Sequence, residues 1–289
     1  MMRMKMGLLA SLALLLHTFS YGQNDTSTAL SNTNNYNAQA PSEEVYKIKP
    51  KLDLPLTIGA TAFTIFGFSQ VYTKEGTPEA TIRNLSVQNI PRFDRWAADI
   101  YNEKAADASD YIFYGSVPVP FLLLADKKIR KDAAKIGLLY LQAMATTGVL
   151  YTGSNMVFNR YRPYTYNPNA TMGDRTEGNA KNSFFAGHAA LVGTATFFTA
   201  KVFADYHPTS NWKWVVYGAA AVATGTTGYL RHRGGRHFPS DILVGTAVGT
   251  LSGILVPHFH KHKLFKDPSL SVLPYSGGLS HGLLLSYKW

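Results

Sequence analysis

Residues 231–241 read RHRGGRHFPSD and contain Arg231, then His237 six residues later, then Asp241 four residues after that. Pro239 suits the first turn of a helix, because its φ is already helical and its missing N–H needs no partner there. Asp241 is then expected one turn inside the helix, where it can reach back to the ring of His237. A carboxylate bonded to one ring nitrogen leaves the other nitrogen as a nucleophile, and Arg231 can hold phosphate oxygens with paired hydrogen bonds.

Two segments upstream carry related chemistry. Residues 183–188 read SFFAGH, in which Gly187 allows close backbone approach and His188 opens an apolar helix. Backbone N–H groups at a helix start bind anions, and a histidine there can protonate a leaving alkoxide. Arg162 precedes Pro163 at the end of a long apolar stretch. Taken singly, these segments could equally be a helix-capping loop and a basic anchor at a membrane interface.

The composition narrows the class of protein. The 289 residues include no cysteine, which excludes disulfide frameworks, thiolate zinc sites and cysteine nucleophiles. Charged residues make up 16% of the chain, below the roughly 25% usual in soluble domains. The net charge of +10 favours anionic partners such as phosphates or acidic lipids. The sequence contains no recognisable nucleic-acid-binding module, so nucleic acid is not an expected partner, and the oligomeric state is left open.

The N-terminal region predicts export. A positive start, an apolar stretch at 7–16 (GLLASLALLL) and small residues before Gln23 predict a cleaved signal peptide at 1–22. An uncleaved anchor is the alternative. Residues 23–50 are polar, rich in Asn, Ser and Thr, and predict a disordered leader.

Apolar runs with many small residues dominate the region 51–265 and predict an all-α bundle of about six core helices. The expected core helices are 54–72, 110–125, 133–158, 187–206, 212–230 and 239–259. Residues 91–108 are amphipathic and charged, and are expected to form a surface or interfacial helix. Small residues let helices approach closely in a bilayer, so membrane association is expected, although a tight soluble bundle has the same composition. Residues 266–289 form a tail, with turn residues that predict a short strand or hairpin.

Two basic loops suggest how the bundle is oriented in a membrane. Residues 126–135 (DKKIRKDAAK) and 258–266 (HFHKHKLFK) are rich in lysine and are expected in the cytoplasm. Helix alternation then puts the three loops with chemistry on the periplasmic side, in the cell membrane or periplasm. A cleaved signal conflicts with this order, because 54–72 and 110–125 would both have to run inward. The alternating His258, His260 and His262 are expected to belong to a basic loop, with no metal site.

Taken together, Arg-Pro, Ser-x3-Gly-His and Arg-x5-His-x3-Asp resemble the signature of the type 2 phosphatidic acid phosphatase / vanadium haloperoxidase superfamily. That signature is Lys-x6-Arg-Pro, Pro-Ser-Gly-His and Ser-Arg-x5-His-x3-Asp. The resemblance covers about residues 110–260. It implies an all-α bundle that hydrolyses phosphate monoesters or diphosphates, often on lipids, without a metal or other cofactor.

The resemblance also implies a role for each matching residue. His237 is similar to the nucleophile that forms a phosphohistidine, and Asp241 to its orienting carboxylate. His188 resembles the acid that protonates the leaving group. Arg162 and Arg231 resemble phosphate clamps. The sixth matching residue is Gly187, which would give a backbone N–H to the phosphate.

The chain departs from the signature at several positions. Asn155 stands where the family has its first lysine, and Ala186 where it has the serine before Gly-His. Phe185 replaces the proline and Leu230 the last serine. One cationic clamp and one hydroxyl donor are therefore missing, and each such donor contributes about a hundred- to a thousandfold in rate. Four nearby basic residues could compensate: Arg160, Lys181, Arg233 and Arg236.

The leading expectation is a membrane-associated phosphatase acting on a phosphorylated lipid or another phosphate ester. Phosphatidic acid, phosphatidylglycerol phosphate, a polyprenyl diphosphate and lipid A are candidate substrates. The departures at Asn155 and Ala186 motivate a second hypothesis, a weakened member that binds an anionic headgroup. A vanadate-dependent haloperoxidase and a soluble phosphatase of broad specificity are the remaining alternatives.

Overall fold

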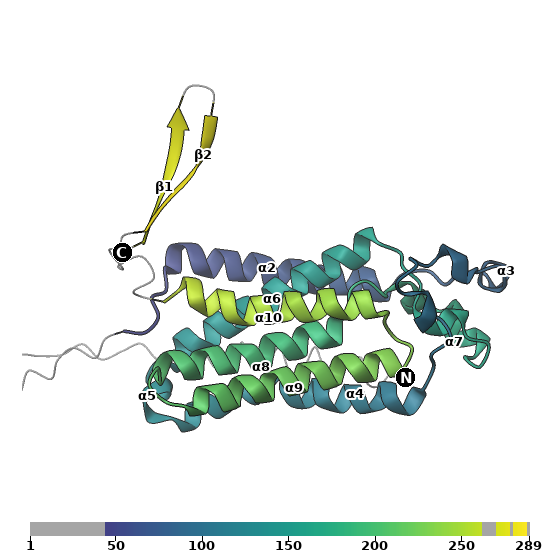
Figure 1. The fold of residues 1–289 in the computed structure, drawn as a ribbon, viewed down its shortest axis with the longest axis horizontal. Coiled ribbons are helices and arrows are strands. Elements are labelled where there is room, and N and C mark those ends of the chain that lie inside the picture. Colours follow the sequence, from purple (N-terminus) through teal and green to yellow (C-terminus); the bar gives the residue numbers. More distant parts are fainter. Residues whose placement is uncertain (1–43, 262–269, 278–279, 288–289) are drawn as a thin grey trace, which may run out of the picture. The chain divides into compact units, whose positions relative to one another are not determined.

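The structure is a computed structural model that describes residues 44–261, 270–277 and 280–287 (Figure 1). The predicted signal peptide at 1–22 and most of the predicted leader lie outside the described residues. Within the described residues six long helices form the bundle, which confirms the all-α prediction. They are α2 (Pro50–Tyr72), α4 (Glu103–Ser116), α6 (Ala133–Val157), α8 (Gly187–Tyr206), α9 (Trp212–Arg233) and α10 (Pro239–Phe259).

The shorter elements connect the ends of these helices. The short α-helices are α3 (Glu79–Arg83), α5 (Lys127–Arg130) and α7 (Met172–Thr176). The 3-10 helices are η2 (Val87–Asn89), η3 (Arg95–Ala97), η4 (Val119–Ala125), η5 (Pro163–Tyr166) and η6 (Gly178–Lys181). Successive long helices run in alternating directions, so the C-terminal ends of α2, α6 and α9 meet the N-terminal ends of α4, α8 and α10 at one end of the bundle. We call this the site end.

Helix α8 lies at the centre and packs against α4, α6, α9 and α10. Its closest neighbour is α10, which presents a glycine every fourth residue. A Cβ added at Gly245, Gly249 or Gly253 would lie only 2.5, 2.0 or 2.6 Å from a backbone oxygen of α8 or of the residue before it. These three glycines let the two backbones approach closely, as small residues do between membrane helices. The resulting contact fixes the start of α8 beside the start of α10.

Two predicted helices, 91–108 and 110–125, are wrong in their bounds, because α4 covers parts of both ranges and ends at Ser116, before η4. Residues 91–108 do not form a single helix, but divide into the one-turn η3 and the first part of α4. Asn102 caps α4, because its side-chain oxygen accepts the N–H of Ala105 at 3.0 Å. Asp94 is fully buried by contacts at the site end and draws the preceding turn inward. An amphipathic pattern alone did not reveal that these polar residues would stop the helix.

The opposite end holds residues 44–49, which the sequence assigned to the leader. Tyr46 is fully buried, and its hydroxyl donates to Asp205 of α8 at 2.8 Å. Lys47 N–H donates to His260 O at 2.8 Å. Lys201 and Lys261 also bond Asp205. This network ties the entry to α2 to the ends of α8 and α10.

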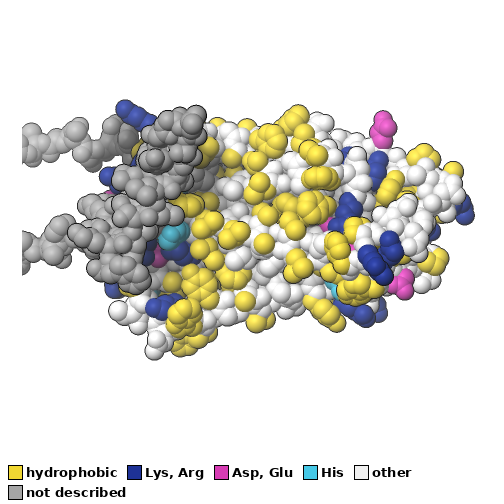
Figure 2. All heavy atoms as spheres, turned by 45° about the horizontal axis from the view of Figure 1, so that its top comes forward, with side chains coloured by type: hydrophobic (Ala, Val, Ile, Leu, Met, Phe, Trp, Pro, Cys, Tyr) yellow, Lys and Arg dark blue, Asp and Glu magenta, His cyan; other side chains and the backbone are white. Residues whose placement is uncertain are grey.

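The surface of the bundle supports a membrane location. Four helical segments are long and apolar enough to cross a membrane, namely Pro50–Tyr72, Glu103–Ala125, Ala133–Val157 and Pro239–Phe259. Figure 2 shows hydrophobic side chains over the middle of the bundle and Lys and Arg side chains gathered toward its ends. This distribution is typical of a protein with a hydrocarbon-facing belt between two polar layers.

The C-terminal tail contains the predicted hairpin. Strands β1 (Leu270–Gly277) and β2 (Ser280–Tyr287) pair antiparallel, with Leu270 opposite Tyr287 and Gly277 opposite Ser280.

Candidate active site

Backbone hydrogen bonds bring the three predicted segments together at the site end. Ser183 N–H donates to Arg160 O at 3.1 Å, which joins the segment after α6 to the one before α8. Ala186 N–H donates to Asp241 O at 3.0 Å, which joins the start of α8 to α10. Tyr164 N–H donates to Gly235 O at 3.0 Å, which joins the segment after α6 to the turn that follows α9. Residues far apart in the sequence therefore form one cluster.

His237 lies in the turn between α9 and α10 and is buried. Its Nδ1 lies 2.7 Å from Ser183 O, and since a carbonyl only accepts, this nitrogen carries the proton. The other nitrogen, Nε2, is then unprotonated and can act as a nucleophile. Burial lowers the pKa of His237 well below its usual value, and the charges of Arg162 and Arg231 lower it further. The ring is therefore neutral at physiological pH.

The turn that carries His237 depends on Gly235. Its φ of +65° lies in the left-handed region, and an added Cβ would lie 2.1 Å from Ile100 O. Glycine avoids both the strain and the collision. The backbone can therefore reverse between Arg231 and His237 within a tight space.

Asp241 does not bond the ring of His237, contrary to the expectation from its spacing. Its Oδ2 accepts Ser183 Oγ at 2.6 Å and Phe238 N–H at 3.0 Å, and its Oδ1 accepts Arg160. At the third helical position of α10, the carboxylate turns back to cap the helix instead of reaching the imidazole. Ser183 connects the two groups, because its hydroxyl bonds Asp241 while its carbonyl accepts the proton of His237.

Arg160 and Asp94 form a buried ionic cluster beneath this network. Arg160 Nη2 donates to Asp94 Oδ2 at 2.6 Å, and its Nη1 donates to Ser240 Oγ at 2.9 Å. Asp94 also accepts the backbone N–H of Ser240 at 3.2 Å. The guanidinium of Arg160 stacks 4.5 Å from the ring centroid of Phe238. Both Nη atoms of Arg160 thus hold the start of α10, which argues against Arg160 as a substitute for the missing lysine.

His188 opens α8 and is oriented by Asp110 of α4. Its Nε2 lies 3.0 Å from Asp110 Oδ1, and its ring packs 4.7 Å from the centroid of Phe113. The same carboxylate oxygen lies 3.2 Å from Arg231 Nη1. Asp110 is a site residue that the sequence reasoning did not identify. The available signal was a carboxylate at the start of an otherwise apolar stretch.

Three arginines present unpaired donors in the cluster. The buried Nε atoms of Arg162, Arg231 and Arg236 have no hydrogen-bond partner among the described residues. Arg162 and Arg236 both lie close enough to Arg231 to act on its charge. Buried polar groups in proteins are nearly always paired, so three unpaired guanidinium N–H groups indicate a site built for an anion.

The start of α8 adds further donors. Its N-cap is Ala186, and no side chain caps the helix, so its first N–H groups lack the usual partner. An added Cβ at Gly187 would lie 2.6 Å from the ring of Tyr151, which explains the glycine. Gly187 and His188 thus begin an uncapped helix beside His237, and the positive end of a helix dipole favours phosphate.

Two of the positions that depart from the family signature, Asn155 and Ala186, are buried and uncharged. Asn155 donates from Nδ2 to Tyr151 O at 2.9 Å, and its Oδ1 has no partner among the described residues. Ala186 is fully buried. Among the suggested substitutes, Arg233 is exposed and Lys181 is partly buried. Arg236 is the one whose buried nitrogen points to an anion-binding role.

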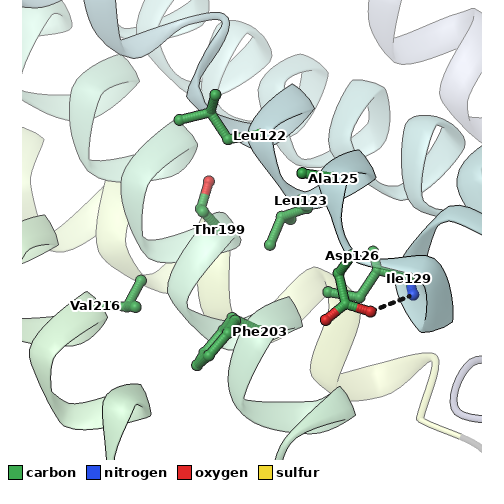
Figure 3. A pocket seen from close by; sticks show the side chains of 8 residues that line it. All are labelled: Leu122, Leu123, Ala125, Asp126, Ile129, Thr199, Phe203 and Val216. Carbon is green, nitrogen blue, oxygen red and sulfur yellow. Dashed lines mark hydrogen bonds between the residues drawn. The ribbon is translucent and has the colours of Figure 1, made fainter.

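Other features lie away from these residues. A mostly apolar pocket of about 400 Å³ lies at the opposite end of the bundle. Figure 3 shows the residues that line it, among them Leu123, Phe203 and Val216. Groups of three or more potential metal-ligating side chains were not found within the described residues. His260 bonds Val256 O at 2.8 Å and lies 3.3 Å from Asp53, whereas His262 lies outside the described residues.

The match to a family model agrees with the motifs. Residues 136–265 match the model of the PAP2 superfamily. The chain is also similar to a crystal structure described as the first transmembrane PAP2 type phosphatidylglycerolphosphate phosphatase from Bacillus subtilis, at 19% identity and a TM-score of 0.42, over 70% of this chain and 94% of that chain. No curated protein matches the sequence at a significant level.

Proposed function

We propose, from the match of residues 136–265 to the model of the PAP2 superfamily, that the protein is a membrane phosphatase that hydrolyses a phosphate monoester or diphosphate on a lipid. The observation that carries the proposal is the set of buried arginine Nε atoms that have no partner among the described residues, together with the buried His237 on which the charges of Arg162 and Arg231 act. A phosphate dianion matches this arrangement in charge, and its oxygens accept paired hydrogen bonds from guanidinium groups.

In the proposed reaction, His237 Nε2 attacks the phosphorus in line with the leaving oxygen. The bond from phosphorus to the leaving oxygen breaks as the nitrogen–phosphorus bond forms, and His188 donates a proton to the departing alkoxide. Water then attacks the phosphorus and the nitrogen–phosphorus bond breaks, while His188 takes a proton from the attacking water. Inorganic phosphate leaves, and both histidines return to their starting states.

The phosphate cradle would consist of three side chains and one helix end. Arg162 and Arg231 hold the phosphate oxygens, as the family resemblance implies. Arg236 supplies the third positive charge in place of the lysine that is absent at Asn155. The backbone N–H of Gly187 contributes from the start of α8. Preorganised donors of this kind stabilise the charge that develops in the transition state.

The proposed membrane orientation places the site end at the periplasmic face. Exposed cations of α5, including Lys127, Lys128 and Arg130, lie at the other end, where the positive-inside tendency favours the cytoplasm. If all six long helices cross, residue 44 also lies at that cytoplasmic end. A cleaved signal at 1–22 requires the reverse orientation, so the periplasmic site and the cleaved signal are alternatives.

Phosphate release from lipid substrates tests the proposal. The purified protein in detergent is given phosphatidic acid, phosphatidylglycerol phosphate, a polyprenyl diphosphate and lipid A in separate reactions. We expect release from at least one substrate and none from His237→Ala. His258→Ala, a histidine change at the opposite end of the bundle, serves as the matched control and should retain full activity. Equal release by the natural protein and His237→Ala would remove the enzymatic function.

A second candidate function is binding of an anionic headgroup without turnover. It is favoured by the neutral, buried Asn155 and by Ala186, which leave the cradle short of one charge and one hydroxyl. The double variant Asn155→Lys/Ala186→Ser restores both groups. Phosphate release that appears only in the double variant would identify the natural protein as a binder.

A further inference from the structure

The segment 86–101, which we call the strap, has two chemically different faces. Phe93 and Trp96 are 66% and 61% exposed, although both are large and apolar. Asp94, between them in sequence, is completely buried. The strap therefore directs aromatic side chains outward and a charged side chain inward, the reverse of the usual preference for a soluble surface.

The strap connects two of the segments that can cross a membrane, Pro50–Tyr72 and Glu103–Ala125. Both of its ends are therefore held at the site end of the bundle, where the hydrophobic belt gives way to the polar layer. Aromatic residues with one polar atom are enriched at this level of membrane proteins. Trp96 satisfies its indole N–H by donating to Phe93 O at 2.8 Å, so its ring can enter an apolar environment without an unpaired donor.

Two arginines complete an interfacial pattern. Arg92 is exposed beside Phe93 and is free to meet lipid phosphates. Arg95 instead donates to Gln88 O at 2.9 Å and to Ile90 O at 3.0 Å. These bonds occupy backbone carbonyls of the strap that would otherwise be unpaired near the hydrocarbon.

The inner face of the strap contacts the turn that carries His237. Asp94 accepts a hydrogen bond from Ser240, in the first turn of α10. It also accepts one from Arg160, which itself bonds Ser240. Ile90 and Phe238 belong to one buried cluster, and Phe238 directly follows His237 in the chain. A shift of the strap would thus move the first turn of α10.

We propose that the strap docks on the lipid surface through Phe93 and Trp96, and that this docking holds the His237 turn in its working position through Asp94. The partner is the headgroup region of the bilayer that contains the substrate. The docking itself does not depend on the proposed phosphatase function, whereas its effect on turnover rests on that function.

Fluorescence quenching tests the docking without any activity. The variant Trp212→Phe/Trp214→Phe/Trp289→Phe retains Trp96 as its one tryptophan. It is placed in bilayers of phosphatidylcholine brominated on its acyl chains, with unbrominated phosphatidylcholine as the reference. We expect the bromines to quench Trp96 emission strongly. Equal emission in both bilayers would overturn the proposal whether or not the protein is a phosphatase.

Kinetics test whether docking of the strap on lipid affects turnover of the lipid substrate. Phe93→Ser/Trp96→Ser is expected to raise KM for a vesicle-bound lipid phosphate about tenfold, because two large apolar side chains lose their contact with lipid. KM for a water-soluble phosphomonoester should stay unchanged. Trp212→Ser/Trp214→Ser, which removes equally exposed aromatic residues at the opposite end, is the matched control and should leave both KM values unchanged. An equal KM for the lipid in the two double variants would contradict the proposal.

A third variant separates docking from positioning. Asp94→Asn keeps the aromatic side chains and removes the charge that meets Arg160. It should lower kcat on both substrates at least tenfold and leave KM and Trp96 quenching unchanged. An unchanged kcat would show that the strap does not position the His237 turn.

Discussion

Replacing Arg236 by alanine tests whether this residue supplies the missing positive charge. Its Nε is buried and has no partner in the part of the chain that the structure describes, and its guanidinium lies 5.1 Å from the ring centroid of Tyr164. Loss of one donor that stabilises a transition state lowers kcat by about a hundred- to a thousandfold. The lost contact with Tyr164 should reduce the free energy of unfolding by only about 0.5–1 kcal/mol, as expected for a partly exposed cation–π pair.

The assay measures kcat for phosphate release at saturating lipid phosphate, together with thermal unfolding of the same sample. Arg233→Ala is the matched control, because Arg233 lies three residues earlier and is exposed. It should keep kcat within about twofold, as surface changes usually do. Arg236→Lys should recover part of the loss, since the charge returns without the planar donor group. A kcat for Arg236→Ala equal to that of Arg233→Ala would refute the assignment.

Three further predictions concern the nucleophile and the orientation of the bundle. Ser183→Ala removes a hydrogen bond to the buried carboxylate of Asp241 and should lower kcat about ten- to a hundredfold at unchanged KM. This magnitude corresponds to about 1.5–3 kcal/mol for a hydrogen bond to a charged group. A change in KM without a change in kcat would argue against a positioning role for Ser183. Since burial and two arginines lower the pKa of His237, its ring should remain neutral at pH 6. NMR titration of ¹⁵N-labelled histidines measures this, with His237→Ala to identify the signal. A titration midpoint of 6.5 would contradict the prediction. Because the unfolded chain then binds this proton more readily than the folded protein, the histidine should also reduce stability as the pH falls below 6.5. The chain has no cysteine, so single cysteines can report on the orientation of the bundle. A membrane-impermeant maleimide should label Asn89→Cys in intact cells, and Lys128→Cys only after permeabilisation. The reverse pattern would put the site in the cytoplasm and agree with a cleaved signal.

The helices were largely predictable because each apolar run starts or ends at a residue with a clear physical effect. Pro239 begins α10, and Gly187 begins α8, at the positions expected from the sequence. The three motif segments also converge as expected. Residues 91–108 failed because an amphipathic count cannot detect that Asp94 will be buried by partners 66 and 146 residues away.

The hydrogen-bond partners within the candidate site were less predictable than the segments that form it. The spacing of His237 and Asp241 permitted a direct bond, but the carboxylate instead caps its own helix and acts through Ser183. Asp110 escaped notice because it belongs to a helix that carries no motif. Such contacts depend on how the helices pack against one another, and local sequence patterns do not contain the packing geometry.

Trapping the covalent intermediate tests the central claim most directly. The natural protein and His237→Ala are mixed with a ³²P-labelled lipid phosphate, quenched rapidly in alkali and separated from free lipid. The account predicts an alkali-stable, acid-labile phosphoprotein whose label maps to His237 and is absent from the variant. Label on another residue, or turnover of the labelled lipid by His237→Ala, would contradict it.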